Sequence, residues 1–317
     1  MATTLTLTTA ITSTSIVDIE SVGEEKRDIT TLLNYWKRLE NRSISVDFST
    51  PGAQERLDEL SNLNEAHTVL IHDVRGDESK YTLERNGFQY VHHHVKELED
   101  CSNEEQVREV LLPATEELVK QITGATKIVT FAHRIRCFAT DERQLAASQA
   151  PAHDVHSDFT SSGAMEHLKD IIQDQAEFNR LLDGRILAIN VWRPLKQIRK
   201  DPLAVCDWRS VDSETDLVAN RMIFSHGWKE LAKANFNPKH MWYYLGGQMP
   251  NEPLLFKQFD SKAKDGMNLP HTAFVDLKYI ECNPRESIEI KIILGRAYYP
   301  AKTVGLTVQA VGNTASN

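Results

Sequence analysis

The chain has 317 residues and a formal net charge of −9, and 41% of its residues are hydrophobic. This length and composition allow one large domain, or one domain with helical additions. The acidic balance disfavours nucleic acid or a membrane surface as a partner, because their phosphates would repel the chain. Its four cysteines form no CxxC pair, which disfavours zinc-ribbon and disulfide frameworks.

The ends of the chain differ in composition from the rest. Residues 1–22 are rich in threonine and lack both a basic segment and a long apolar core, so we predict a poorly ordered segment and no secretion signal. The small, polar residues 301–317 form a predicted tail. Between them, residues 23–300 are predicted to form one domain. No run reaches the roughly 20 apolar residues of a membrane span, so the predicted location is the cytosol.

Helices and strands alternate irregularly in the first half of the domain. Apolar residues at helical spacing predict an amphipathic helix over residues 23–42, followed by a short strand at Thr68–His72. A capping box of Ser102 and Glu105 predicts a helix over residues 106–121, bent at Pro113. A strand over residues 127–138 and a helix over residues 164–182 follow.

Strand-like runs dominate the second half. One helix is predicted around residues 221–235, and no GxGxxG or P-loop motif occurs. The pattern predicts a mainly β fold with flanking helices, an antiparallel barrel or jelly roll. The strand-like runs are ILAINVW, LAVCDW, MWYYL, LLFKQF, HTAFVDL and SIEIKIIL.

A candidate metal site begins at His156-Ser157-Asp158. Residues two apart in a strand point to the same side, so His156 and Asp158 can reach one ion. An HxD pair alone is a weak signal. A site of two histidines and one carboxylate needs a second histidine, and His226, His240 and His271 are the candidates downstream. We favour His271, because it opens a good strand.

A basic anchor follows His271. Arg285 and Ser287 share one face of an alternating run, and a guanidinium fork with a hydroxyl suits a carboxylate. We predict that this pair holds the far carboxylate of 2-oxoglutarate. Arg296 is the alternative anchor.

The order HxD, His, Arg-x-Ser resembles the fungal Fe(II)/2-oxoglutarate-dependent oxygenases related to gibberellin desaturase and aspergillic-acid hydroxylase. The stretches NVWRPL, VCDWRSV, WYYLGGQMPNEPLLFKQFDS, PHTAFVD and PRESIEI carry the resemblance. It implies a double-stranded β-helix (jelly roll, cupin-like) that binds Fe(II) through His156, Asp158 and His271. It also implies 2-oxoglutarate and O2 as cosubstrates, with ascorbate as a candidate stimulant. The implied reaction is hydroxylation, desaturation or ring closure of a small molecule in specialised metabolism, with release of succinate and CO2.

Four further residues are predicted to contact the substrate. Arg134 and Arg136 share one face of a strand, Asn190 is polar within an apolar run, and Tyr244 is an aromatic residue on a strand. An amino acid or an amino-acid-derived compound is one candidate substrate. His153 and the run His92-His93-His94 are less favoured ligands.

Two other functions remain open from the residues alone. One is a cupin-like metal-dependent hydrolase or isomerase that uses the same ligands. The other is a non-catalytic barrel that only binds a ligand. The oligomeric state is not predicted.

Overall fold

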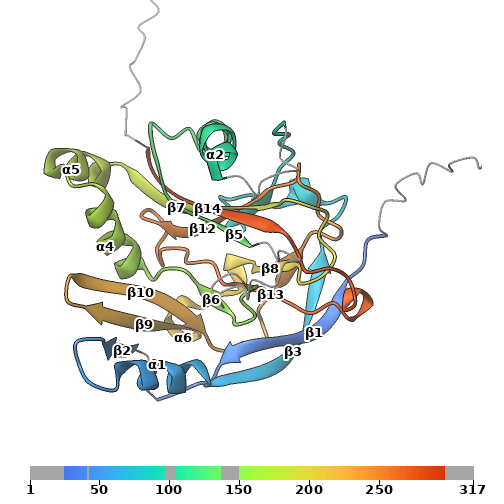
Figure 1. Ribbon diagram of the computed structural model, residues 1–317, viewed down its shortest axis with the longest axis horizontal. Helices are drawn as coiled ribbons and strands as arrows, with labels where there is room; N and C mark the ends of the chain where they lie inside the picture. The colour runs from blue at the N-terminus through green and yellow to red at the C-terminus, as the bar shows by residue number, and fades with distance from the viewer. Residues whose placement is uncertain (1–24, 41–42, 97–103, 137–149, 297–317) are drawn as a thin grey trace, which may run out of the picture.

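The computed structural model describes residues 25–40, 43–96, 104–136 and 150–296. These residues form two sheets (Figure 1), with strand orders β1-β3-β11-β8-β13-β6-β10-β9-β2 and β4-β12-β7-β14-β5. The predicted poorly ordered ends, residues 1–22 and 301–317, lie outside the described residues, and the single domain over 23–300 stays a prediction. No helix among the described residues is long and apolar enough to span a membrane.

The five-stranded sheet is antiparallel throughout, and its ten-residue strands β7 and β14 pair along their whole length. All but the first residue of β7 are buried. This explains why ILAINVW reads as an apolar run rather than as a strict alternation. The strands are β4 (Phe88–Tyr90), β5 (Lys127–Arg136), β7 (Arg185–Pro194), β12 (Leu254–Asp260) and β14 (Ser287–Arg296).

The nine-stranded sheet is mixed, because β11 pairs with β3 and β2 pairs with β9 in parallel. Its short strands β6, β8 and β13 lie next to one another and carry the HxD motif and His271. The strands are β1 (Ile29–Trp36), β2 (Ser43–Asp47), β3 (Asn64–Asp73), β6 (His156–Ser157), β8 (Leu203–Cys206), β9 (Leu217–Phe224), β10 (Gly227–Ala234), β11 (Trp242–Tyr244) and β13 (His271–Ala273).

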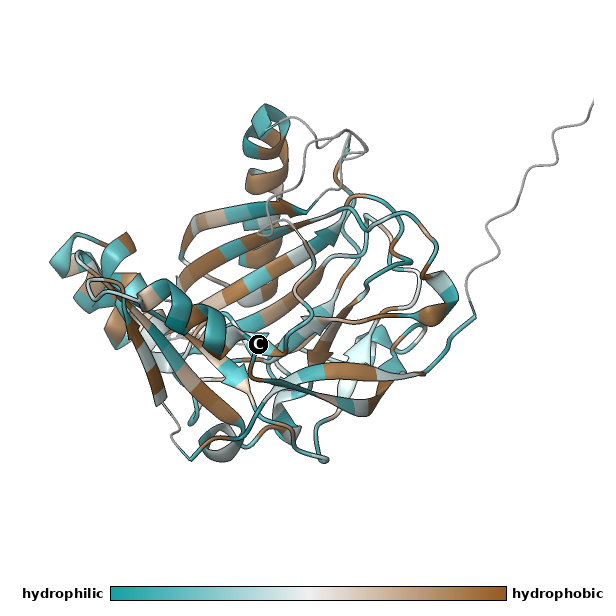
Figure 2. Ribbon diagram, turned by 60° about the horizontal axis from the view of Figure 1, so that its bottom comes forward, coloured by the Kyte–Doolittle hydropathy of each residue, from teal (hydrophilic) through white to brown (hydrophobic). Residues whose placement is uncertain are grey.

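The two sheets face each other across a shared core, as in a jelly roll. One buried cluster joins Trp192 and Phe256 of the five-stranded sheet to Val205 and Tyr243 of the nine-stranded sheet. Brown, hydrophobic segments run through the strands of both sheets, whereas the outer helices carry long teal stretches (Figure 2). Each strand-like run predicted between residues 186 and 294 contains a strand, although in HTAFVDL the strand ends at Ala273.

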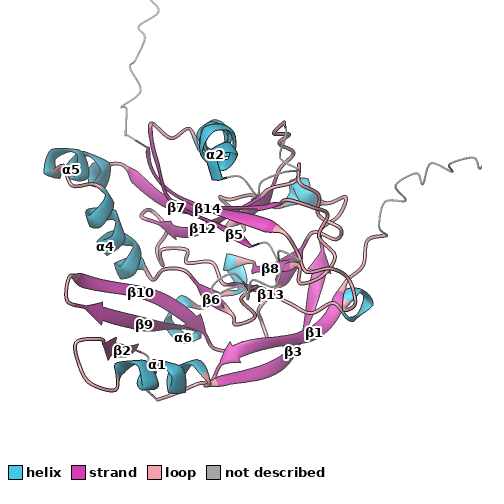
Figure 3. Cartoon of the chain, in the orientation of Figure 1, coloured by secondary structure: helices cyan, strands magenta, loops and turns pink. Residues whose placement is uncertain are grey.

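Helices cover the outside of the barrel (Figure 3). The longest, α3, packs with the turn before it against the five-stranded sheet, where Val107, Leu111 and Val119 meet Ile288 and Ile290. The helices are α1 (Ala53–Ser61), α2 (Glu104–Gln106), α3 (Leu112–Thr123), α4 (Ser161–Ile171), α5 (Gln175–Asp183) and α6 (Ser213–Asp216).

Two predicted helices are interrupted. The helix expected over residues 106–121 contains a π-helical segment, Val107–Leu111, before α3 begins. Pro113, which has no backbone N–H, is the second residue of α3 and directly follows the π-helical segment. The helix expected over residues 164–182 is two helices, because Asp174 caps a new one by accepting a hydrogen bond from the backbone N–H of Glu177. Ser102 of the predicted capping box lies outside the described residues.

The predicted helix over residues 23–42 is wrong. Residues Ile29–Trp36 form β1, which pairs with β3 over eight residues. Leu33 and Tyr35 are buried, whereas Leu32 is 58% exposed. This period of two was hidden because Leu32, Leu33 and Trp36 also fit a helical spacing, and cross-strand pairing decided between the two.

The predicted helix around residues 221–235 is also wrong. These residues lie in the hairpin of β9 and β10, which pair over eight residues. The turn falls at Ser225-His226, and Gly227, which follows it as the first residue of β10, has a φ of 142°, a conformation that other residues rarely adopt. Glu230, Ala232 and Ala234 are buried and alternate with more exposed residues, as a strand requires.

Candidate metal centre

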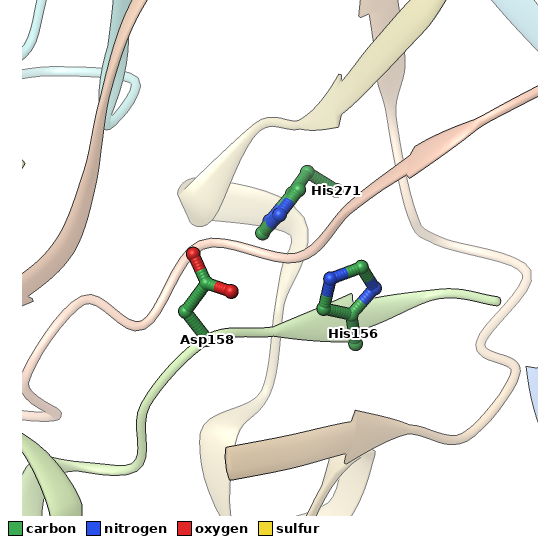
Figure 4. A group of neighbouring side chains, drawn as sticks. All are labelled: His156, Asp158 and His271. Atoms are coloured by element: carbon green, nitrogen blue, oxygen red, sulfur yellow. The ribbon is translucent and has the colours of Figure 1, made fainter. Parts of the chain in front are cut away.

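His156, Asp158 and His271 come together between the two sheets. β6 and β13 pair so that His271 lies directly opposite His156, and Asp158 follows two residues after His156. One potential ligand atom from each residue lies within 4.8 Å of the others. Figure 4 shows the three side chains pointing toward a common centre. The strand pairing brings together residues 115 positions apart, because 271 − 156 = 115.

Both histidines are oriented through Nδ1. His156 Nδ1 is 2.7 Å from the carbonyl oxygen of Asp154, and His271 Nδ1 is 3.3 Å from that of Leu269. A carbonyl can only accept, so each Nδ1 carries the proton and each Nε2 keeps a free lone pair. Burial lowers the pKa of His156 to about 4, helped by the neighbouring His271, and burial also lowers the pKa of His271. Two neutral imidazoles are the form that binds a metal.

The carboxylate of Asp158 is held through one oxygen. Lys291 Nζ lies 2.7 Å from Oδ2, and Asn190 Nδ2 donates a hydrogen bond to the same oxygen. Burial by itself raises the pKa of Asp158, but the charge and the hydrogen bond of Lys291 oppose this, and the pKa is lowered overall. Asp158 is therefore a carboxylate at neutral pH, and the contacts on Oδ2 leave Oδ1 for a ligand.

Gln258 of β12 connects the segments that carry the three side chains by hydrogen bonds. Its Oε1 accepts hydrogen bonds from the Asp158 backbone N–H at 2.6 Å and from Ser157 Oγ at 2.9 Å. Its Nε2 donates to the Leu269 carbonyl, which also accepts from His271. Gln258 is fully buried and thus couples the HxD strand to the His271 segment. Gln258 is not among the residues predicted from the sequence, although a glutamine within the apolar run LLFKQF was a signal.

A pocket of about 240 Å³ opens on the three side chains and extends to Arg285. We call it the triad pocket; its lining includes His156, Asp158, His271, Arg285, Trp192 and Lys291. Arg285, Glu289 and Lys291 line it together because they alternate on one face of the run through β14. That face was visible in the sequence, but we did not single out Lys291.

Arg285 and Ser287 retain unused hydrogen-bonding atoms. Arg285 is 5% exposed and donates from Nη1 to the Asp201 carbonyl, while its Nε has no partner among the described residues. Ser287 Oγ is likewise buried and unpartnered within that part of the chain. Burial and the nearby Arg136 lower the pKa of Arg285 to about 10, which leaves it charged at neutral pH. Buried donors without partners are costly, so these two fit an absent anionic group.

The predicted substrate residues lie in different places. Arg134 and Arg136 line the triad pocket, and Arg136 also donates to the Ala150 carbonyl. Asn190 lines neither this pocket nor its neighbour, and instead bonds Asp158 and Glu289. Tyr244 lies apart, because its hydroxyl donates to the Arg27 carbonyl and its ring packs on Phe274. The structure thus gives Asn190 and Tyr244 contacts other than a substrate contact.

The competing histidines have other contacts. His226 stacks on Phe224 at the hairpin turn, and His240 bonds Tyr35 and Asp216. His153 lies 3.5 Å from Asp201, and His93 contacts Arg193. His156, Asp158 and His271 are the group of three metal-binding side chains found within the described residues. The side chain of Arg296, the alternative anchor, lies outside them.

Two imidazole nitrogens and one carboxylate oxygen, with a buried cationic anchor in the same pocket, are the donor set that suits iron(II) with open coordination positions. The hydrogen bonds on Nδ1 and Oδ2 orient these ligands as outer partners do in metal sites. The unpartnered Arg285 Nε and Ser287 Oγ suit the carboxylate of a keto acid. The residues present therefore fit both groups.

Known proteins resemble this chain over most of its length. A family model described as an oxidoreductase/YMDC permease-like domain matches residues 33–294. The hydroxylase/desaturase efuI of Hormonema carpetanum is 32% identical over 84% of this chain and 94% of its own length. The gibberellin cluster GA4 desaturase of Gibberella fujikuroi is 29% identical over 71% of this chain and 86% of its own.

Solved structures share the fold. The iron and alpha-ketoglutarate-dependent endoperoxidase NvfI matches with a TM-score of 0.70 at 25% identity, over 86% of this chain and 99% of that one. A relative named Fe(II)/2-oxoglutarate-dependent dioxygenase nvfI, from Aspergillus novofumigatus, is 28% identical over 72% of this chain and 83% of its own length. The predicted jelly-roll fold is confirmed.

Proposed function

This chain belongs to the fungal Fe(II)/2-oxoglutarate-dependent oxygenases, and from that membership we propose that His156, Asp158 and His271 bind the iron that its reaction requires. The enzyme oxidises a C–H bond of a small molecule in fungal specialised metabolism and releases succinate and CO2. The observation that carries the ligand assignment is the convergence of three metal-binding side chains beside an anchor with unused donors. A metal-dependent hydrolase or isomerase would not need that anchor. A non-catalytic barrel that only binds a ligand would not need it either.

Each residue has a definable task in this proposal. Iron with bound 2-oxoglutarate and O2 supplies the oxidising power when present. His156 and His271 present neutral Nε2 lone pairs, and Asp158 supplies one carboxylate oxygen and a compensating charge. Arg285 and Ser287 orient the keto acid through its far carboxylate. The guanidinium carbon of Arg285 lies 5.3 Å from the centroid of the Trp192 ring, which also contacts this cation.

The test is an anaerobic titration of the purified protein with Fe(II) and 2-oxoglutarate. A weak visible charge-transfer band is expected, and Arg285→Gln should raise the 2-oxoglutarate concentration needed for half of it by about ten- to a hundredfold. His226→Ala is the matched control and should leave the band unchanged. If the wild-type protein shows no band, or His271→Ala retains it, the ligand assignment fails.

Several finer predictions belong with this proposal. Ascorbate stimulation, an amino-acid-derived substrate and the choice among hydroxylation, desaturation and ring closure stay predictions. So do a cytosolic location and the lack of a nucleic-acid or membrane partner, which the acidic composition supports. Succinate formation with and without ascorbate, and microscopy of a fluorescently tagged chain, are the direct measurements.

A further inference from the structure

A second and larger pocket adjoins the triad pocket. Its volume is about 400 Å³, and we call it the aromatic pocket after Phe131, Phe159 and Trp228 in its lining. It shares Arg134, Asp158, Leu231 and Lys291 with the triad pocket. A molecule held there therefore lies beside the carboxylate assigned to iron, while the keto acid occupies the space around Arg285.

Apolar side chains from three elements line the aromatic pocket. Phe131 of β5 and Phe159, which precedes α4, flank His167 of α4, with ring centroids 4.5 and 5.4 Å from the imidazole. Met222, Trp228 and Leu231 of the β9–β10 hairpin also line it. Such surfaces suit flat or ring-bearing apolar skeletons.

A β-bulge lets Phe131 reach this pocket. The pairing of β5 with β14 skips one residue, because Lys291 is opposite Ala132 and Ile292 is opposite Thr130. Phe131 is the unpaired residue between them. Strict alternation would direct Phe131 and Arg134 to opposite faces, yet both line the aromatic pocket. The bulge thus places an aromatic ring and a guanidinium around one space.

The charges of the pocket are unbalanced. Its two carboxylates are already paired, because Asp158 contacts Lys291 and Glu230 contacts Arg221 at 2.7 Å and Ser162 at 2.5 Å. Arg134 and Lys229 also line the pocket, and no hydrogen bond or ion pair holds either side chain within the described part of the chain. The uncompensated charge is therefore positive. Burial lowers the pKa of His167, so this imidazole adds no charge at neutral pH.

We propose that the substrate is an apolar, ring-bearing molecule with one anionic group, which Arg134 binds while the skeleton lies against Phe131, Phe159 and Trp228. The inference rests on the proposed function and deepens it. Arg134 is preferred over Lys229 because it also lines the triad pocket and its planar fork suits a carboxylate. The anion then fixes which C–H bond faces the iron ligands.

Two fluorescent probes that differ in charge test this. The first is 1-anilinonaphthalene-8-sulfonate, an aromatic anion, and the second is N-phenyl-1-naphthylamine, its neutral counterpart. Both are titrated into the full chain loaded with Fe(II) and 2-oxoglutarate under anaerobic conditions. Arg134→Gln should raise the dissociation constant of the anionic probe about tenfold, and that of the neutral probe less than about twofold. Lys239→Gln, an equal charge change outside both pockets, should alter neither.

Ala132→Trp provides the second variant, because Ala132 lines the aromatic pocket and a bulky ring there should displace both probes. The proposal is overturned if Arg134→Gln weakens both probes equally or neither, or if Ala132→Trp leaves both bound. Circular dichroism and the charge-transfer band of each variant separate misfolding from a binding effect. Absence of the band in the wild type refutes the proposed function instead, whatever the probes do.

Discussion

Two buried groups of histidine and carboxylate side chains differ in how completely they are hydrogen-bonded: one is centred on β6 and β13, and the other joins His240, in the loop before β11, to Asp216 at the end of α6. In the first, His156 and His271 use Nδ1 for backbone carbonyls and leave Nε2 free beside Asp158. In the second, His240 uses both nitrogens, at 3.1 Å from Tyr35 Oη and 3.1 Å from Asp216 Oδ2.

The second group is closed by further partners. Trp242 Nε1 donates to Tyr35 Oη at 2.7 Å, and Asn237 and the backbone N–H of Asp212 donate to Asp216. Every imidazole nitrogen in it has a protein partner, so a metal would have to break a bond before binding. The comparison teaches that an unused lone pair, rather than the presence of histidine and aspartate, distinguishes a ligand set from a structural network.

The largest expected effect comes from removing a side chain of the first group, that of His156. His156→Ala should lower 2-oxoglutarate turnover by about a thousandfold or more, because iron loses one of its three proposed protein ligands. Iron content after anaerobic loading and succinate formation measure this. His240→Asn is the comparison variant and should keep its iron. Equal iron loss in both variants would contradict the conclusion that only the first group binds iron.

A stability effect is expected from the second group. Asp216→Asn should lower the free energy of unfolding by about 2–3 kcal/mol, because a buried, multiply hydrogen-bonded carboxylate loses its charge and one acceptor. Urea denaturation followed by circular dichroism measures this change. Iron binding at temperatures where the variant is folded should match the wild type. An unchanged unfolding midpoint would contradict a structural role for the network.

Asn190 tests the role of the hydrogen bonds around the proposed metal ligands. Asn190→Ala removes a hydrogen bond to Asp158 Oδ2 and should weaken iron binding about tenfold, the usual effect of losing an outer partner of a ligand. Because Asn190 lines neither pocket, the Michaelis constant for a substrate, once one is known, should change little. A variant that binds iron normally but loses substrate affinity would restore the sequence-based assignment of Asn190 as a substrate contact.

The smallest expected effect is a pH dependence of stability. Burial by itself raises the pKa of Asp216, but hydrogen bonds from His240, Asp212 and Asn237 outweigh it and lower the pKa from 3.8 to about 2. A lowered pKa gives stability that is complete above pH 3.8 and is lost as the pH falls toward 2. Between pH 3.8 and 2 the wild type should therefore lose about 1 kcal/mol more stability than Asp216→Asn. Parallel pH profiles for the wild type and the variant would refute this.

The sequence by itself determined the local geometry of the proposed site. Strand periodicity placed His156 with Asp158, and Arg285 with Ser287, on common faces, because alternation depends only on backbone pleating. The run through β14 also carried Glu289 and Lys291 on that face. The order of the motifs indicated the family, and each of the six strand-like runs from residue 186 onward contains a strand.

Only the tertiary structure decided which distant side chains meet. The opposition of His271 and His156 depends on the register of β13 against β6, and the anchoring by Gln258 depends on how β12 faces them. Residues 29–36 and 221–235 fit a helical spacing, yet pairing with β3 and within the β9–β10 hairpin made them strands. The bulge at Phe131 arises in the same way. Such outcomes depend on long-range contacts whose energy exceeds local preference, and a local pattern does not contain them.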